Sequence, residues 1–173
     1  MTYYEICLKG IEIEKGLLIA RNLCRAVAEL HKLKIIHGDI ASENVLVNPV
    51  TYEVKLIDFD LARREGTKMI AGGNNDFVNE TMLNAITKQK QIIVSKKNDL
   101  YSLGLMCYLL IGDSKKKFFR SIISDEVLTP KLKEEMIRNE TFSGVKYIIS
   151  LIENKVTAAD AAIWFDKRWK MEV

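Results

Sequence analysis

The sequence is poor in the residues that build metal cages and disulfide frameworks. Its 173 residues include only three cysteines and two histidines. The cysteines lie far apart in the sequence and form no C-x-x-C pair, so they offer too few ligands at metal spacing for a zinc site. An odd number of cysteines also favours a reducing compartment over a secreted disulfide scaffold.

Long apolar runs are absent too, which argues against membrane insertion and secretion. The longest run, LYSLGLMCYLLI, is too short to span a bilayer. The N-terminal stretch MTYYEICLKGIEIEK has charges where a signal peptide needs an apolar core. We therefore expect a soluble, cytoplasmic protein that makes no contact with a membrane.

No large excess of either charge is present, since the formal net charge is only +3 at pH 7. The basic clusters at residues 96–97 and 115–117 have no aromatic residues between them. They are therefore typical of solvated loop ends rather than of a nucleic-acid surface. Nucleic acid is not an expected partner.

Residues 1–173 are expected to form one mainly helical domain. The contents of 48% hydrophobic and 28% charged residues are those of a globular chain, and no linker or low-complexity tract divides it. Apolar positions recur at helical spacing from about residue 17 to 33. Residues 98–111 are apolar nearly all round, which predicts a buried helix. Further helices are expected at residues 115–124, 130–138, 143–153 and 157–168, with Thr157 and Asp160 as a cap of the last.

Strand patterns are short and few. One is expected at residues 3–8. Two others, VLV and EVKLID, flank the turn-like NPVTY and predict a small hairpin. Residues 59–80 show no regular pattern and predict a long irregular loop, of the kind that is usually functional.

Two polar turns carry the residues that can do chemistry. Asp39 and Asn44 share one loop, and Asp58 ends the hairpin that follows. If the hairpin folds back, three oxygen-bearing side chains meet at one site. Proteins bind Mg²⁺ through one or two carboxylates together with substrate phosphates, and a carboxylate left free nearby can accept a proton from an attacking hydroxyl. Phosphoryl transfer requires this division of roles.

These residues also occur in a known order. H-G-D-I-A-S-E-N resembles the protein-kinase catalytic loop H-R-D-L-x-x-x-N, and D-F-D resembles the kinase D-F-G motif. The resemblance implies ATP and Mg²⁺ as cofactors, with Asp39 as the catalytic base. It implies Asn44 and Asp58 as the metal ligands. His37 and Phe59 would be packing residues that support the site.

The resemblance extends into the segment that follows. Residues 58–80 resemble a kinase activation segment. Within it, Gly66-Thr67 and Ala71 are similar to the end of that segment, and Glu80 stands where the family has the glutamate of A-P-E.

Two further stretches complete the match. NDLYSLGLMCYLL is similar to the kinase helix with the D-x-W-S-x-G pattern, so that Asp99 would brace the catalytic loop and Tyr101 would replace the tryptophan. SLIENKVTAADAAIWF resembles the closing kinase region, with Lys155 where the family has an arginine that pairs with the A-P-E glutamate. The match runs from about residue 3 to 169. It implies a kinase C-lobe, a helical bundle with a small β-hairpin that carries the catalytic and metal-binding loops.

Kinases also need an N-lobe, which supplies a glycine-rich loop, a lysine and a glutamate to the nucleotide. No G-x-G-x-x-G occurs in the sequence, and no V-A-I-K-like strand precedes residue 37. Residues 1–16 resemble the hinge-like start of a C-lobe. We therefore expect a truncated kinase-like chain that has lost most of the rate of transfer, since this rate depends on positioning and electrostatics.

Three substitutions within the motifs point the same way. Gly38 replaces the arginine that often pairs with a phosphorylated activation loop. Ala41 replaces a lysine near the transferred phosphate. Asp60 replaces the glycine of D-F-G and adds negative charge beside Asp58.

The expected function is therefore binding. The chain would bind or regulate another protein, either as a pseudokinase decoy for a complete kinase or as an acceptor of an N-lobe in trans. The alternative is an active Ser/Thr-type protein kinase that transfers the ATP γ-phosphate to a protein hydroxyl, with Asp39 as base. H-G-D with I-D-F-D also resembles small-molecule phosphotransferases of the aminoglycoside-kinase type, which lack an activation segment. A purely structural helical domain is the remaining possibility.

Overall fold

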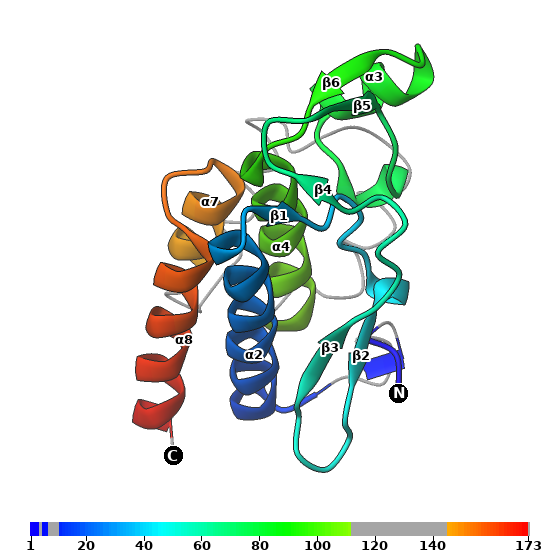
Figure 1. The fold of residues 1–173 in the computed structure, drawn as a ribbon. Helices are drawn as coiled ribbons and strands as arrows, with labels where there is room; N and C mark the ends of the chain where they lie inside the picture. The colour runs from blue at the N-terminus through cyan, green and yellow to red at the C-terminus, as the bar shows by residue number, and fades with distance from the viewer. Residues whose placement is uncertain (4, 7–10, 112–144, 173) are drawn as a thin grey trace.

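The computed structural model describes residues 1–3, 5–6, 11–111 and 145–172 (Figure 1). Four helices form one body, and six short strands pair into three two-stranded sheets. The elements are α2 (Ile13–Lys32), β1 (Ile35–Ile36), η1 (Ser42–Asn44), β2 (Val45–Val47), β3 (Val54–Leu56), β4 (Arg63–Arg64), β5 (Lys68–Ile70), η2 (Asn75–Phe77), α3 (Glu80–Thr87), β6 (Gln91–Ile93), α4 (Lys96–Ile111), α7 (Val145–Ile152) and α8 (Ala158–Glu172).

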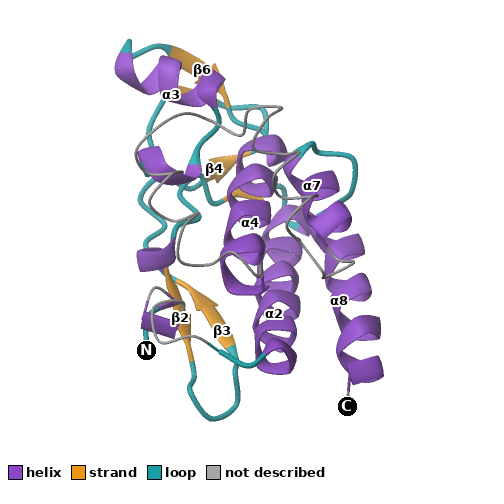
Figure 2. Cartoon of the chain, turned by 180° about the vertical axis from the view of Figure 1, so that it is seen from behind, coloured by secondary structure: helices purple, strands orange, loops and turns teal. Residues whose placement is uncertain are grey.

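The helical body consists of α2, α4, α7 and α8, which lie side by side (Figures 1 and 2). The predicted helix over residues 17–33 is confirmed as α2, whose apolar stripe faces the core. The predicted buried helix over 98–111 is confirmed as α4, in which every residue from Asp99 to Ile111 is buried. The expected mainly helical architecture is therefore correct. No helix in the described ranges has the length and apolar character that crossing a membrane requires.

A glycine allows α4 and α7 to cross closely, and its replacement gives a first prediction. A Cβ at Gly104 would lie 2.4 Å from Ile152 Cγ1 and 3.2 Å from the Ile152 backbone nitrogen. We expect Gly104→Ala to lower the free energy of unfolding by about 1–3 kcal/mol, because overpacking outweighs the gain in helix propensity. Urea denaturation followed by circular dichroism measures the change.

The control for this prediction is Gly72→Ala. A Cβ there would meet only methyl and methine carbons of the Leu61 side chain, the nearest at 3.3 Å, and a side chain can move more easily than a backbone. Equal stabilities of the two variants would show that the helix crossing tolerates a methyl group.

The predicted hairpin is confirmed as β2 and β3. Its register pairs Val45 with Leu56, and Asn48 caps its turn by accepting hydrogen bonds from two backbone amides. The turn rests on α2, where Asn22 Nδ2 donates to Tyr52 O across 2.8 Å. Because Val45 and Leu56 pair at one end of the hairpin, the loops before and after it lie next to each other.

The prediction of an irregular loop over residues 59–80 is wrong in part. In that stretch β4 pairs with β1, and β5 pairs with β6, which lies outside it. Both ladders join segments far apart in the sequence, so the short runs that form them carry little local pattern. The helix α3 was not expected at all. With β5 and β6 it encloses a second, small core made by Ala71, Met82, Ala85, Val78, Ile86 and Ile92.

Near the N-terminus the predicted strand is wrong, whereas the predicted cap of the last helix is confirmed. Residues 3, 5 and 6 are helical rather than the predicted strand, and the buried Tyr3 hydroxyl donates to Met106 O across 2.5 Å. The Thr157–Asp160 cap of α8 is confirmed as a reciprocal pair. The Thr157 hydroxyl and then the Thr157 backbone amide donate to Asp160 Oδ2, and these two bonds lower the pKa of the Asp160 carboxyl. Residues 4, 7 and 8 of the predicted strand, and the helices predicted at 115–124 and 130–138, lie outside the described residues.

Two cysteines that are far apart in the sequence meet inside the helical body. The Sγ atoms of Cys24 and Cys107 are 3.9 Å apart, and both residues are buried free thiols. Burial raises the pKa of the Cys24 thiol well above its usual range, so the thiol stays protonated. The pair therefore packs as two small apolar groups.

Candidate active site

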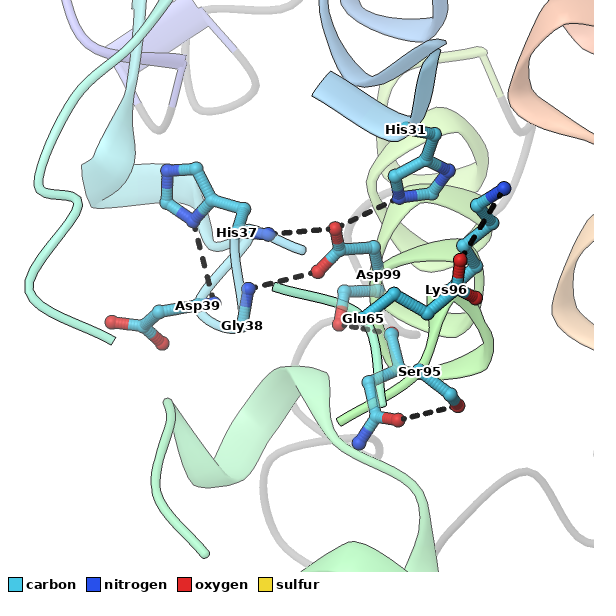
Figure 3. Close-up of polar contacts among 10 residues, drawn as sticks. His31, His37, Gly38, Asp39, Glu65, Ser95, Lys96 and Asp99 are labelled. Atoms are coloured by element: carbon cyan, nitrogen blue, oxygen red, sulfur yellow. Dashed lines mark hydrogen bonds and ion pairs between the residues drawn. The ribbon is translucent and has the colours of Figure 1, made fainter. Parts of the chain in front are cut away.

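A buried aspartate at the start of α4 holds the loop that carries Asp39. Asp99 is 1% exposed, and its carboxylate accepts hydrogen bonds from the backbone amides of His37 and Gly38, both at 2.9 Å (Figure 3). The His31 ring supplies a third contact across 2.9 Å. Since an ionised carboxylate only accepts, His31 Nε2 is the donor. One buried carboxylate with three donors therefore ties the loop to the helical body.

Two glycines let the backbone pass close to this loop. Gly38 has φ of +80°, and a Cβ there would lie 3.0 Å from Leu61 O. Gly73 has φ of +124°, and its Cβ would lie 3.1 Å from Gly38 O. Residues with a side chain rarely adopt these backbone angles. The glycine at position 38, where kinases commonly have an arginine, is therefore part of how this loop folds.

The Asp39 carboxylate is held on both of its oxygens. Asn44 Nδ2 donates to Asp39 Oδ2 across 2.9 Å and to the Asp39 backbone oxygen across 3.0 Å. The backbone amide of Asn74 donates to Asp39 Oδ1 across 2.7 Å. Each carboxylate oxygen has a second lone pair, so Asp39 can still accept a proton from a substrate. The side chain is half-buried, which leaves it open on one side.

Asp58 lies beside this pair without touching it. The Ile57 amide donates to Asn44 O across 3.0 Å and so joins the two loops at the end of the hairpin. Asp58 is exposed and adopts φ of +61°, a conformation that costs energy for a residue with a side chain. Within the described ranges its carboxylate accepts a hydrogen bond from the amide of Asp60 alone, across 3.4 Å, and is not hydrogen-bonded to Asp39 or Asn44. The strained backbone therefore presents a carboxylate that has free oxygen lone pairs.

His37 fills the space between the two loops. It is fully buried, and its Nε2 lies 3.2 Å from Ile57 O. Its Nδ1 accepts the amide of Asp39 across 3.3 Å, which assigns the proton to Nε2. The Phe59 ring packs on it with ring centroids 4.8 Å apart, although Phe59 is 46% exposed. His37 therefore supports both loops, and Phe59 covers it from the solvent side.

The residues present fit a magnesium ion. Asn44 Nδ2 faces Asp39, so its Oδ1 points elsewhere and accepts no hydrogen bond in the described part of the chain. Asn44 Oδ1 and the Asp58 carboxylate are hard oxygen ligands of the kind that Mg²⁺ takes, with its other positions filled by water and phosphate. A complete protein cage is not built, since no group of three His, Cys, Asp or Glu side chains gathers among residues 1–3, 5–6, 11–111 and 145–172.

The other residues singled out by the resemblance lie away from Asp39. Gly66-Thr67 form the turn between β4 and β5, and the chain that contacts Asp39 is Gly73-Asn74 instead. Lys155 Nζ lies 2.8 Å from Glu153, and no ion pair joins it to Glu80 within the described ranges. Tyr101 is buried in α4.

Sequence reasoning missed two contributors to the site. His31 ends a helix whose pattern indicates only core packing, and its pairing with Asp99 depends on the fold. Asn74 contributes through its backbone amide, which no residue type reveals, while its side chain hydrogen-bonds Glu43 Oε1. The Gly- and Asn-rich stretch GGNND was the one available signal that a turn lies here.

The sequence is similar to those of known protein kinases. A family model described as a protein kinase domain matches residues 7–157. Myosin light chain kinase 2 of skeletal and cardiac muscle from rat is 25% identical over 158 residues, which cover 85% of this chain and 25% of that protein. The rabbit protein of the same name is 29% identical over 144 residues, covering 77% and 23%.

Smooth-muscle myosin light chain kinase from chicken is 33% identical over a shorter stretch of 96 residues, which covers 53% of this chain and 5% of that protein. The chain thus spans about a quarter or less of the length of these relatives. The expected fold, similar to a kinase C-lobe, is confirmed by the family match together with the helical architecture.

Proposed function

Because this chain belongs to the protein kinase family, we propose that it supplies the catalytic base and the magnesium ligands of a phosphotransfer site whose nucleotide is covered by a partner acting in trans. The observation that supports this proposal most directly is the position of the Asp39 carboxylate. It is held between Asn44 and the Asn74 amide, on a loop that Asp99 braces. Preorganised groups of this kind contribute most of the rate in phosphoryl transfer.

Each residue then has a separate role. Asp39 would accept the proton of a protein hydroxyl as the hydroxyl oxygen bonds to the γ-phosphorus of ATP, while the bond from that phosphorus to the β–γ bridging oxygen breaks and ADP leaves. Asn44 and Asp58 hold Mg²⁺ through their side-chain oxygens. ATP with Mg²⁺ supplies the γ-phosphoryl group when bound. The relatives are, by name, kinases of myosin light chains, and for this chain we propose a serine or threonine hydroxyl of a protein as the acceptor.

Exposed apolar side chains beside these loops support the idea of a covering partner. Leu46, Ile57 and Phe59 are 37%, 36% and 46% exposed, and they belong to the hairpin and the loop after it. An exposed apolar patch commonly marks an interaction site, and we propose that these three side chains contribute to one. Residues 1–173 contain no glycine-rich phosphate loop, and in this proposal the covering protein brings one to the nucleotide. An N-lobe supplied by a second chain has the required chemistry.

Magnesium-dependent ATP binding, measured by isothermal titration calorimetry, tests the proposal. We expect Asp58→Ala to weaken this binding about tenfold or more, equivalent to about 1.4 kcal/mol, because the substitution removes the charged metal ligand. Asp60→Ala is the matched control, since it removes a carboxylate from the same loop without removing a proposed ligand. Equal losses in both variants would mean that only the local negative charge matters, and unchanged binding in Asp58→Ala would reject the metal role.

A second function, binding without catalysis, is favoured by a different observation. Ala41 is fully buried where many protein kinases place a lysine, and Asp60 adds negative charge where the family has glycine. The site therefore has fewer positive groups for a transferred phosphate. A chain of this kind could regulate a complete kinase as a decoy. Measuring phosphate transfer separates the two functions, because only the first function predicts transfer.

The proposed location is the cytoplasm. Cys24 and Cys107 are free thiols although their sulfur atoms are 3.9 Å apart. Paired but unlinked cysteines are typical of a reducing compartment.

A further inference from the structure

The sheet formed by β5 and β6 exposes two isoleucines on its outer face. The register pairs Lys68 with Ile93 and Ile70 with Gln91, so these four side chains share one face. Met69 and Ile92 alternate to the other face, where Ile92 packs on the second core. Ile70 is 54% exposed and Ile93 is 64% exposed. Two bulky apolar groups thus stand in solvent on a sheet of only two strands.

The β6 strand also has a free hydrogen-bonding edge. Val94 N donates to Thr67 O and Ala71 N donates to Lys90 O, both across 2.9 Å. These two bonds show which residues of β6 direct their backbone groups toward the β5 side. In an antiparallel pair the residues between such positions direct their backbone groups away from the partner strand. Gln91 and Ile93 therefore direct their amides and carbonyls outward, and no partner for them is found in the described part of the chain. Figures 1 and 2 show β6 at the outer end of the molecule.

The charge around this edge is positive. Residues 87–97 include four lysines and no acidic residue. Lys88 and Lys90 lie directly before β6, are exposed, and make no ion pair with another described residue. Lys96 is partly neutralised, because its Nζ lies 3.6 Å from Glu65. The unpaired lysines therefore sit at the start of an edge whose backbone groups are free.

We propose that the free edge of β6 binds an extended, acidic segment of a partner protein as an added strand. An added strand would satisfy the outward amides and carbonyls of Gln91 and Ile93, which is the usual source of affinity in this mode of recognition. Its apolar side chains would cover Ile93, and its carboxylates would meet Lys88 and Lys90. A second copy of this chain fits less well, since it would bring the lysines of two copies together. This surface is separate from the phosphotransfer site and does not depend on it.

A synthetic peptide tests the proposal directly. A fluorescein-labelled peptide of alternating glutamate and valine is titrated into the full chain, and its fluorescence anisotropy is compared with that of a lysine–valine peptide of equal length. We expect the acidic peptide to bind at least tenfold more tightly, and its affinity to fall with added salt. Equal binding of both peptides, or binding of neither, would overturn the proposal.

Two proline variants identify the edge. Gln91→Pro removes an outward amide of β6 and leaves the ladder with β5 intact, because proline is tolerated on an edge. We expect it to weaken peptide binding at least tenfold. Ile70→Pro is the matched control, since Ile70 lies opposite Gln91 in the register but on the other edge, and it should leave binding within about twofold of wild type. Equal effects of the two prolines would overturn the assignment to β6.

A charge variant keeps the test valid if proline disturbs folding. The double substitution Lys88→Glu and Lys90→Glu leaves the backbone unchanged and should weaken binding of the acidic peptide at least tenfold. Two further measurements test the competing occupants of this edge. Sedimentation of the free chain tests a second copy, and vesicle binding tests a membrane. A dimer that the double substitution does not dissociate, or binding to anionic phosphatidylserine vesicles in place of the peptide, would contradict a peptide partner.

Discussion

Replacing Asp99 with alanine is expected to lower the free energy of unfolding by about 3–5 kcal/mol, the usual cost of removing one partner from a buried charged network. The loss has two parts. The amides of His37 and Gly38 lose their acceptor inside the protein, and His31 loses the group that its ring donates to. A buried donor without an acceptor costs about 1–3 kcal/mol. Urea denaturation measures the change as a lower midpoint.

Asp160→Ala is the control for this variant. Asp160 also accepts hydrogen bonds from a nearby residue, but it is exposed at the cap of α8, and the loss of such a cap costs only about 1 kcal/mol. A loss in Asp99→Ala no larger than in Asp160→Ala would contradict the bracing role. Asp99→Asn should fall between the two, because the amide keeps one acceptor oxygen.

Asp39→Asn is expected to lower the rate of phosphate transfer about 10²–10⁴-fold, the usual contribution of a general base. Asparagine has nearly the same shape but only one acceptor oxygen, so it keeps one of the two hydrogen bonds, from Asn44 or from Asn74, while the proton acceptor is lost. The measurement is radiolabel transfer from Mg-ATP to a protein acceptor. The chain is fused behind the N-lobe of one of its relatives, skeletal-muscle myosin light chain kinase, so that the nucleotide is covered.

The matched control is Asp76→Asn in the same fusion. Asp76 lies in η2, near the Asp39 loop, and contributes its backbone amide to Asn74 rather than its carboxylate. We expect it to transfer phosphate within about threefold of the unmodified fusion, as is usual for a group outside the reacting atoms. Equal rates for Asp39→Asn and the unmodified fusion would reject Asp39 as the base. No transfer by a folded, nucleotide-binding fusion would favour the second function, binding without catalysis.

The sequence predicted the parts of the molecule whose pattern is local. α2 and α4 follow from helical periodicity, and the hairpin follows from two apolar runs around a turn. The loop with Asp39 and Asn44 was also predictable, because only four residues lie between them and a single turn of the chain brings them together. The contact between Asp39 and Asn44 in the structure agrees with that expectation.

The rest depends on pairing between distant segments. β1 pairs with β4 and β5 with β6 through runs of two or three residues, which are too short to show a period. The third anchor of the Asp39 loop is a histidine ring from α2, 68 residues away from Asp99 in the sequence. Backbone amides such as that of Asn74 have no residue-type signature, so they could be found only in three dimensions.

The second core has a consequence for the cooperativity of the molecule. Among the described residues only Ala71, Met82 and Ala85 are buried there, whereas the main core unites the long helices. Because local opening costs less where little apolar surface is buried, we expect this unit to open at a lower free energy than the global transition, which hydrogen exchange would measure. Asn74 lies four residues beyond the end of β5, which belongs to this unit. The loop that carries Asp39 is thus tied on one side to the main helical core through Asp99, and on the other to a small unit that we expect to exchange its amides earlier than that core.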